Sequence, residues 1–134
     1  MRRLGELTWP EARALKQRAP VVLVPVGSTE AHGPHLPLAT DAVLSEELAA
    51  RAAAALDGAG YTTLVAPTLS YAITHYASEF AGTISIAAAT ATALVADVCA
   101  SLVGQGFARV CLINSHLEPA HVASLKEACT RVQQ

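Results

Sequence analysis

The sequence predicts an α/β fold in which helices cover both faces of a mostly parallel sheet, so that the domain has three layers. The first observation is a set of apolar runs of strand length without polar alternation, as in strands that are buried on both faces. The second is that these runs alternate with segments of helical periodicity. Alternating strands and helices with right-handed crossovers produce a parallel sheet between helical layers.

The first two elements are a short helix and a buried strand. Thr8 and Glu11 have the spacing of a capping box, with a proline inside the first turn, and predict a helix over about residues 9–18. The run "VVLVPVG" from Val21 is β-branched and has no polar alternation. It predicts a strand that closes near its proline.

A second helix and two further strands are expected next. From Asp41 a helical stripe runs to the glycines of "DGAG" and contains Leu44, Leu48, Ala52 and Leu56. The segment "YTTLVAPTL" predicts a strand that ends at Pro67, and "GTISI" predicts a short strand over residues 82–86.

The last part of the sequence predicts a helix, a strand and a helix. The segment "AAATATALVADVCASLVGQG" has a stripe at fourfold spacing, made by Leu94, Val98 and Leu102. The apolar run "RVCLIN" predicts a fourth strand. The final segment, "EPAHVASLKEACTRVQQ", has one apolar helical face made by Val122, Leu125, Cys129 and Val132.

Composition indicates one globular domain and excludes several classes of partner. The chain has 134 residues, of which 52% are hydrophobic, and its net charge is −2 with no basic stripe. We therefore expect no nucleic-acid partner. The cysteines Cys99, Cys111 and Cys129 lie in apolar contexts without metal-ligand spacing, which predicts reduced core thiols in a cytoplasmic protein. No signal peptide or membrane-spanning run is present, so we expect no membrane contact.

Two polar loops after predicted strands contain the side chains that metals favour. Glu30 and His32 lie two apart in "STEAH" after the first strand. His116 and Glu118 lie two apart, in the opposite order, in "NSHLE" after the fourth strand. Residues two apart in extended backbone point the same way, with Cα atoms roughly 6–7 Å apart. Such pairs suit two metal ions about 3.5–4 Å apart, with Asp41 as a carboxylate between them.

This ligand set predicts hydrolysis of a C–N bond. Imidazole together with carboxylate favours Zn or Mn over Ca, which prefers oxygen ligands alone. A hydroxide shared by two such ions would be a nucleophile near neutral pH, which suits attack on an amide carbonyl. Asp41 and Glu118 are also the catalytic candidates.

Other interpretations of these residues stay open. Asp41 could act only as a helix N-cap, and Glu30 and Glu118 could be ordinary solvated acids. His116 could be a hydrogen-bonded structural histidine, and we expect His121 to be exposed in a helical first turn. The mirrored pairing of the two loops is what favours a metal site.

Serine and nucleotide chemistry receive less support. Ser28 and Ser115 lie in no G-x-S-x-G motif, and no Ser–His–Asp order is evident. The glycines of "GSTEAHG" lack the spacing of a phosphate-binding loop.

Three segments resemble the creatininase (creatinine amidohydrolase) family. They are "PVGSTEAHGPHLPLATDA", "FAGTISI" and "INSHLEPA", and the resemblance covers about residues 21–122. It implies a dinuclear hydrolase, usually with Zn or Mn, that cleaves cyclic or linear amides on a three-layer α/β fold and commonly forms a hexamer. By position, one ion would be held by Glu30, Asp41 and His116. The other would be held by His32, Asp41 and Glu118.

The sequence also departs from the family pattern. "NSH" with Ser115 replaces the usual "NGH", Pro119 stands where Asn is common, and Ala81 replaces the proline of "FPGT". Family members usually have roughly twice this length, and their later half supplies a His- and Glu-containing motif for substrate binding. We therefore expect residues 1–134 to form one creatininase-like domain that is incomplete at its C-terminal end. The alternative function is a truncated, non-catalytic metal-binding or assembly subunit.

Overall fold

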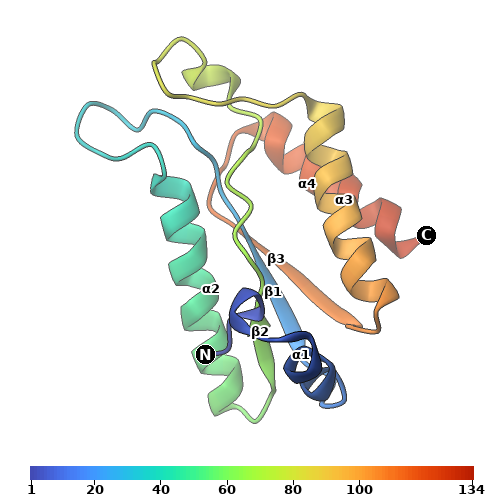
Figure 1. Cartoon of the computed structure of the whole chain (residues 1–134). Coiled ribbons are helices and arrows are strands. Elements are labelled where there is room, and N and C mark those ends of the chain that lie inside the picture. Colours follow the sequence, from blue (N-terminus) through green and yellow to red (C-terminus); the bar gives the residue numbers. More distant parts are fainter.

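The fold consists of three layers, as the sequence predicted. The computed structural model describes residues 1–134. Helix α2 (Thr40–Gly58) covers one face of a parallel sheet, and helices α3 (Ala88–Gly104) and α4 (Pro119–Gln133) pack together on the other (Figure 1). None of the helices has both the length and the apolar character needed to cross a lipid bilayer.

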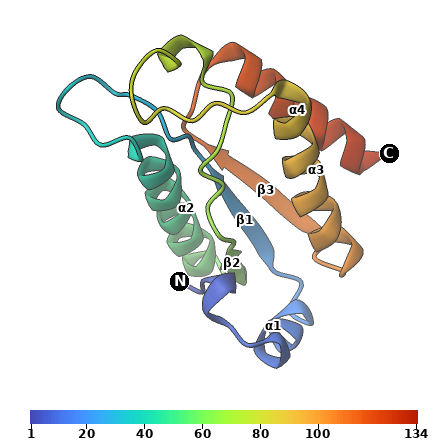
Figure 2. The ribbon, with the colours of Figure 1, turned by 45° about the horizontal axis from the view of Figure 1, so that its top comes forward.

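The sheet has three strands, β1 (Val21–Val26), β2 (Thr63–Val65) and β3 (Arg109–Asn114). Their order in the sheet is β2-β1-β3, and both outer strands run parallel to β1. The central strand is almost fully buried because it has a neighbour on each side and helices on each face. The carboxyl ends of β1 and β3 meet at the same edge of the sheet, where the connecting loops gather, whereas β2 ends opposite Leu23, partway along β1 (Figure 2).

The N-terminal helix α1 (Trp9–Lys16) follows a 3-10 helix, η1 (Leu4–Glu6). Its predicted capping box is confirmed, since the backbone N–H of Thr8 donates to the Glu11 carboxylate at 2.7 Å. The helix ends two residues before the predicted boundary at residue 18. This difference is typical of frayed helix ends.

Helix α2 has the predicted period but a different buried face. Leu44 and Leu48 are each 49% exposed, so the predicted stripe is wrong for these two residues, whereas its other members, Ala52 and Leu56, pack against the core. The helix instead buries a face of small side chains, which lets its backbone approach the sheet closely. Besides Asp41, that face consists of Ala42, Ser45, Ala49 and Ala53.

Helix α2 comes very close to the backbone at Gly27, directly after β1. A Cβ atom added there would fall against the backbone of Asp41 and Ala42. The lack of a side chain at this position therefore allows the first turn of α2 to lie against the end of β1.

The predicted strand over residues 82–86 is wrong. This segment is a loop that makes only an isolated bridge between Ala72 and Ser85. It instead braces the loop after β1: the Thr83 hydroxyl accepts the backbone N–H of Ala31 at 3.1 Å. Gly82 has a φ of 87° and lies against Leu38, so a side chain there would be strained and crowded.

The prediction of three core thiols is correct for only one cysteine. Cys99 is buried, but Cys111 and Cys129 are exposed. Both exposed thiols line a groove along the outer side of β3, with apolar neighbours such as Val110 and Val132. The groove is open because β3 has no neighbouring strand on that side.

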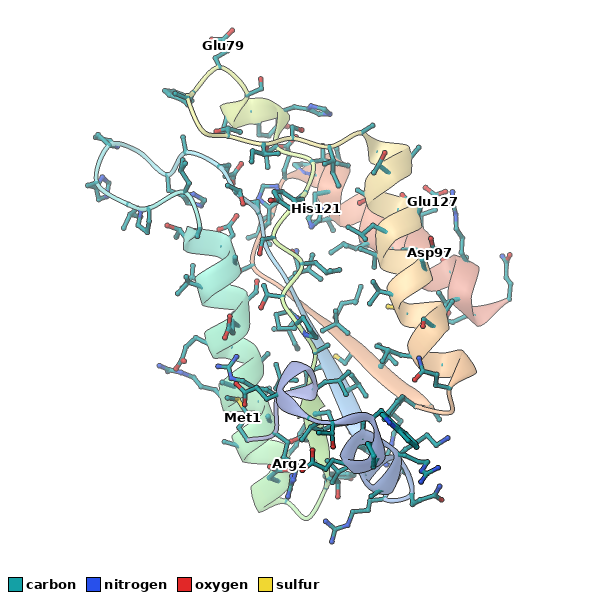
Figure 3. The ribbon with its side chains drawn as sticks, viewed as in Figure 1. Met1, Arg2, Glu79, Asp97, His121 and Glu127 are labelled. Atoms are coloured by element: carbon teal, nitrogen blue, oxygen red, sulfur yellow. The ribbon has the colours of Figure 1, made fainter.

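His121 is buried, with 1% of its surface exposed, so its predicted exposure is wrong. Figure 3 shows it on the inner side of α4, near the gathered loops, whereas Glu79 and Glu127 point outward. Neither ring nitrogen has a hydrogen-bond partner. Burial lowers the pKa of His121 from 6.5 to about 4, and the neighbouring His116 ring, 4.9 Å away between centroids, adds to the shift.

We expect Gly27→Ala to lower the free energy of unfolding by about 1–3 kcal/mol, because the new methyl group must push α2 away from β1. Urea unfolding monitored by circular dichroism measures the change. Gly58→Ala is the matched control, since a Cβ at Gly58 meets nothing within 4 Å. Equal stability of the two variants would contradict the proposed close approach.

We expect His121→Leu to raise the free energy of unfolding of the metal-free protein by about 1–3 kcal/mol at pH 7, because two unpartnered nitrogens are removed. The difference in free energy of unfolding between His121→Leu and the parent should grow as the pH falls from 6.5 toward 4. In this window the unfolded parent binds a proton at His121 that the folded parent does not bind, so the parent loses stability. Urea unfolding at pH 7 and pH 5 measures both effects.

The control for that variant is His35→Leu, because His35 is exposed and its removal should not reproduce the pH-dependent gain. A His121→Leu protein less stable than the parent at both pH values would show that the ring makes a stabilising contact.

Candidate metal centre

The five predicted ligands come from three segments at the carboxyl edge of the sheet. Glu30 and His32 lie in the loop between β1 and α2, and Asp41 lies in the first turn of α2. His116 and Glu118 lie between β3 and α4. Parallel strands place these segments side by side, and the structure brings all five side chains together.

Asp41 lies between the two histidines. Its Oδ1 is 3.0 Å from Nε2 of His32, and its Oδ2 is 2.9 Å from Nδ1 of His116. The helix begins at Thr40 with Ala39 as N-cap, so Asp41 is not the capping residue, and it is 5% exposed. A carboxylate that presents one oxygen to each imidazole has the arrangement of a bridging ligand.

Hydrogen bonds to the backbone fix which nitrogen of each histidine is available. Nε2 of His116 lies 2.7 Å from the carbonyl oxygen of Ile73, and Nδ1 of His32 lies 3.1 Å from that of Glu30. A carbonyl only accepts, so both nitrogens carry the proton. The other nitrogen of each ring is then free to bind a metal, as is usual for ligating histidines.

The available nitrogen of His116 faces two acceptors. Nδ1 lies 2.9 Å from Asp41 and 3.0 Å from Oε1 of Glu30. A lone pair so close to two carboxylate oxygens is repelled unless a cation lies between them, either a proton or a metal ion. The arrangement therefore favours positive charge at this point.

Glu118 is buried close to His116 and is held by backbone N–H groups. It is 7% exposed, and its oxygens accept the backbone N–H groups of His75 at 3.1 Å and Tyr76 at 3.4 Å. Its carboxylate completes a second group of donor atoms within 4.8 Å of one another, with Glu30 and His116. The first such group consists of Glu30, His32 and Asp41.

Burial and neighbouring groups shift the pKa values of two of these residues. Burial raises the pKa of Glu30, and the Asp41 carboxylate adds to the effect while His116 opposes it. Burial opposes the charge of His32, but the Glu30 carbonyl and the Asp41 carboxylate outweigh it and raise its pKa. Burial thus favours the neutral form of Glu30, and the neighbouring acceptors favour the charged form of His32.

The five predicted ligands line an open cleft of about 510 Å³. Its rim contains three apolar side chains that are largely exposed: Tyr76 at 80%, Phe80 at 62% and Leu117 at 75%. The only charged or imidazole side chains that line the cleft are the five proposed ligands. A ligand in this cleft would contact polar groups below and apolar groups at the sides.

Several supporting residues were not identified from the sequence. The Ser28 hydroxyl donates to Oδ2 of Asp41 at 2.8 Å, and the Asn114 amide spans the turn around His116. The helical i, i+4 spacing of Asp41 and Ser45 could have placed both on the buried face of α2. The Ile73 carbonyl has no sequence signal, because only the folded chain brings it to His116.

The serine-hydrolase alternative receives no support from these contacts. The hydroxyl of Ser28 donates to Asp41, and that of Ser115 donates to the Asp41 carbonyl oxygen at 2.7 Å, so neither is bonded to a histidine. His35 is exposed, and His121 is absent from both groups of donor atoms.

The donor set fits a pair of Zn or Mn ions. Two imidazole nitrogens and three carboxylates supply mixed nitrogen and oxygen ligands of the kind these metals favour. Both imidazoles have the second-nitrogen hydrogen bond that orients a ligating ring.

Sequence comparison extends over nearly the whole chain. The family model described as creatininase, creatinine amidohydrolase, matches residues 5–134. The creatinine amidohydrolase of Pseudomonas putida is 36% identical over 121 residues, which are 86% of this chain and 45% of that protein. The mycofactocin precursor peptide peptidase of Mycobacterium tuberculosis is 36% identical over 99 residues, 70% of this chain and 39% of that protein. The chain therefore spans less than half the length of these two relatives.

Solved creatininase structures share the fold. A crystal structure of creatinine amidohydrolase matches with a TM-score of 0.84 at 31% identity, over 97% of this chain and 50% of that chain. A manganese form of creatininase gives a TM-score of 0.84 at 31% identity, over 98% and 51%. A variant creatininase of Zn–Zn type matches with a TM-score of 0.81 at 29% identity, over 97% of this chain and 50% of that chain. Since both the family model and the fold extend over almost every residue, this chain belongs to the creatininase family.

Proposed function

We propose that this chain provides the metal-binding part of a dinuclear, metal-dependent amidohydrolase. The observation that carries the proposal is the crowding around His116, whose available nitrogen faces the carboxylates of Asp41 and Glu30 at 2.9 and 3.0 Å. The choice of Zn or Mn is supported by the matching creatininase structures, one of which is a manganese form and another of Zn–Zn type.

One ion would be held by Glu30, Asp41 and His116, and the other by His32, Asp41 and Glu118. The two oxygens of Asp41 face different histidines, which supports its role as the shared ligand. The donor atoms that lie together in the structure are divided differently, since Glu118 lies with His116 and Glu30 belongs to both groups. Glu30 also lies 3.8 Å from Nε2 of His32, so its carboxylate is within reach of both imidazoles.

When bound, the ions would polarise an amide carbonyl and activate a water as nucleophile near neutral pH. Asp41 and Glu118 are the proposed catalytic carboxylates because both line the cleft where the amide would lie. The N–H groups of His75 and Tyr76 keep Glu118 oriented toward His116. Tyr76 and Phe80 would exclude water from the sides of a bound substrate.

The proposed substrate is a small molecule with an amide bond, either cyclic or linear. The relatives include proteins that are named for creatinine and for a precursor peptide. The apolar rim of Tyr76, Phe80 and Leu117 favours a linear amide with an apolar flanking group, because creatinine offers little apolar surface to cover. By the family resemblance, the active assembly is proposed to be a homo-oligomer, commonly a hexamer, in which residues 1–134 form a single domain.

A second candidate function is a non-catalytic metal-binding or assembly subunit. The observation in its favour is the open side of β3, where an apolar groove is lined by residues such as Val110, Leu112 and Val132. Uncovered apolar surface beside an edge strand is typical of a surface that associates with another protein segment.

We expect protein purified without chelator to contain two divalent ions per chain and Asp41→Asn to contain less than one, because the shared ligand has lost its charge. Elemental analysis by mass spectrometry after gel filtration measures the ratio. Asp97→Asn is the control, since Asp97 is exposed on α3 and should leave the metal content unchanged (Figure 3). A low ratio in the parent that Asp41→Asn does not change would refute the dinuclear site.

We expect the metal-loaded protein to hydrolyse a linear amide with an aromatic flanking group faster than creatinine. Phe80→Ala should reduce this preference, because it removes part of the apolar rim. Glu118→Gln should lower kcat by about 100-fold or more, as expected for loss of a catalytic carboxylate. Product formation by mass spectrometry measures each rate. Full metal content without turnover on either substrate would support the non-catalytic subunit instead.

A further inference from the structure

Two serines connect the three segments that carry the proposed ligands. Ser45, on the buried face of α2, is 0% exposed, and its hydroxyl donates to the carbonyl oxygen of Val26 at 2.5 Å. The backbone N–H of Ser115 donates to the Ser45 hydroxyl at 3.0 Å. The Ser115 hydroxyl donates in turn to the Asp41 carbonyl oxygen at 2.7 Å. The two hydroxyl oxygens lie 2.5 Å apart.

Each end of this network lies next to a proposed ligand. Val26 is the last residue of β1, directly before the loop that carries Glu30 and His32. The Asp41 carbonyl belongs to the proposed bridging residue, and Ser115 precedes His116 in the chain. A change in any of these bonds would therefore move one ligand-bearing segment relative to another.

We propose that Ser45 and Ser115 are positioning residues that hold the two ligand loops and Asp41 in one arrangement before an ion binds. The inference rests on the proposed metal function and assigns a role to Ser115, where the family motif usually has glycine. Glycine keeps the backbone N–H but has no hydroxyl, so it cannot bond the Asp41 carbonyl. In this chain the hydroxyl supplies a direct connection between β3 and the first turn of α2.

These hydrogen bonds would favour metal binding by preorganisation, because they hold the ligating groups in place before an ion arrives. Ligating groups must be held within about 0.5 Å of their working positions, and the bonds behind them provide this restraint. Asp41 and His116 come from segments that are 75 residues apart in sequence, so local chain stiffness cannot set the 2.9 Å distance between their side chains. Loss of a supporting hydrogen bond behind a metal ligand typically weakens metal affinity about 10–100-fold.

The test compares Ser115→Ala, Ser45→Ala and Ser115→Gly with the parent and with Ser124→Ala. Ser124 is a matched control because it is also buried and its hydroxyl also donates to a backbone carbonyl, that of His121 at 2.7 Å. Zinc affinity is measured by competition with a chromophoric chelator. We expect zinc to bind about 10–100-fold more weakly to Ser115→Ala, Ser115→Gly and Ser45→Ala than to the parent. Zinc affinity should be unchanged in Ser124→Ala. It should also be close to that of the parent in Ser115→Thr, because threonine keeps a hydroxyl.

Two further measurements separate positioning from a general effect on stability. The visible spectrum of the Co²⁺-substituted protein should change in Ser115→Ala, because ligand geometry changes, and should match the parent in Ser124→Ala. Amide hydrogen exchange of the metal-free protein should show lost protection in the loops over residues 29–32 and 115–118. If Ser45→Ala does not fold, Ser115→Gly is compared with the parent instead, because glycine is the residue that the family motif usually has at this position.

The outcomes distinguish this inference from the proposed function. If the parent binds zinc and the Ser45 and Ser115 variants match its affinity, spectrum and exchange, the positioning role is overturned and the metal site stands. If the parent binds no ion, the proposed function fails, and exchange of the metal-free protein decides the positioning role alone. Lost protection in both loops then supports the role, and unchanged exchange overturns it.

Discussion

The arrangement of the whole carboxyl edge depends on one buried carboxylate that faces two imidazoles. Asp41 presents one oxygen to His32 and the other to His116, and the remaining nitrogen of each ring is committed to a backbone carbonyl. Each histidine therefore offers a lone pair toward negative charge, which is stable only where a cation lies between them. Burial strengthens this requirement because solvent screens the charges less.

The fold provides this arrangement through close backbone contacts. Gly27 lets the first turn of α2 lie against the end of β1, so that Asp41 reaches the centre of the site. The loop over residues 82–86 braces the segment that contains Glu30, through Thr83 and through the Ile84 N–H bond to the Thr29 carbonyl. All proposed ligands and the contacts that orient them thus lie within this chain, which covers 50% of the matching creatinine amidohydrolase structure.

Local sequence patterns predicted the elements whose structure depends on near neighbours in the chain. The capping box at Thr8, the buried strand from Val21 and the helical periods all follow from spacing over a few residues, and the structure has them. The gathering of the two mirrored pairs of polar residues was also predictable, because residues that follow neighbouring parallel strands lie at one edge of the sheet. The strand predicted over residues 82–86 was wrong because its backbone N–H groups donate to separate loops, that of Ile84 to Thr29 and that of Ile86 to Ala72, instead of to one neighbouring strand.

The sequence by itself determined the fold class and the five side chains that gather at the carboxyl edge, since both follow from periodicity and from the order of strands and helices. Only the tertiary structure decided which face of α2 is buried, that His121 lies inside the protein, and which nitrogen of each histidine is available. These features depend on distances between segments remote in sequence. Small residues let α2 approach the sheet, and the Ile73 carbonyl orients His116 only once the chain has folded.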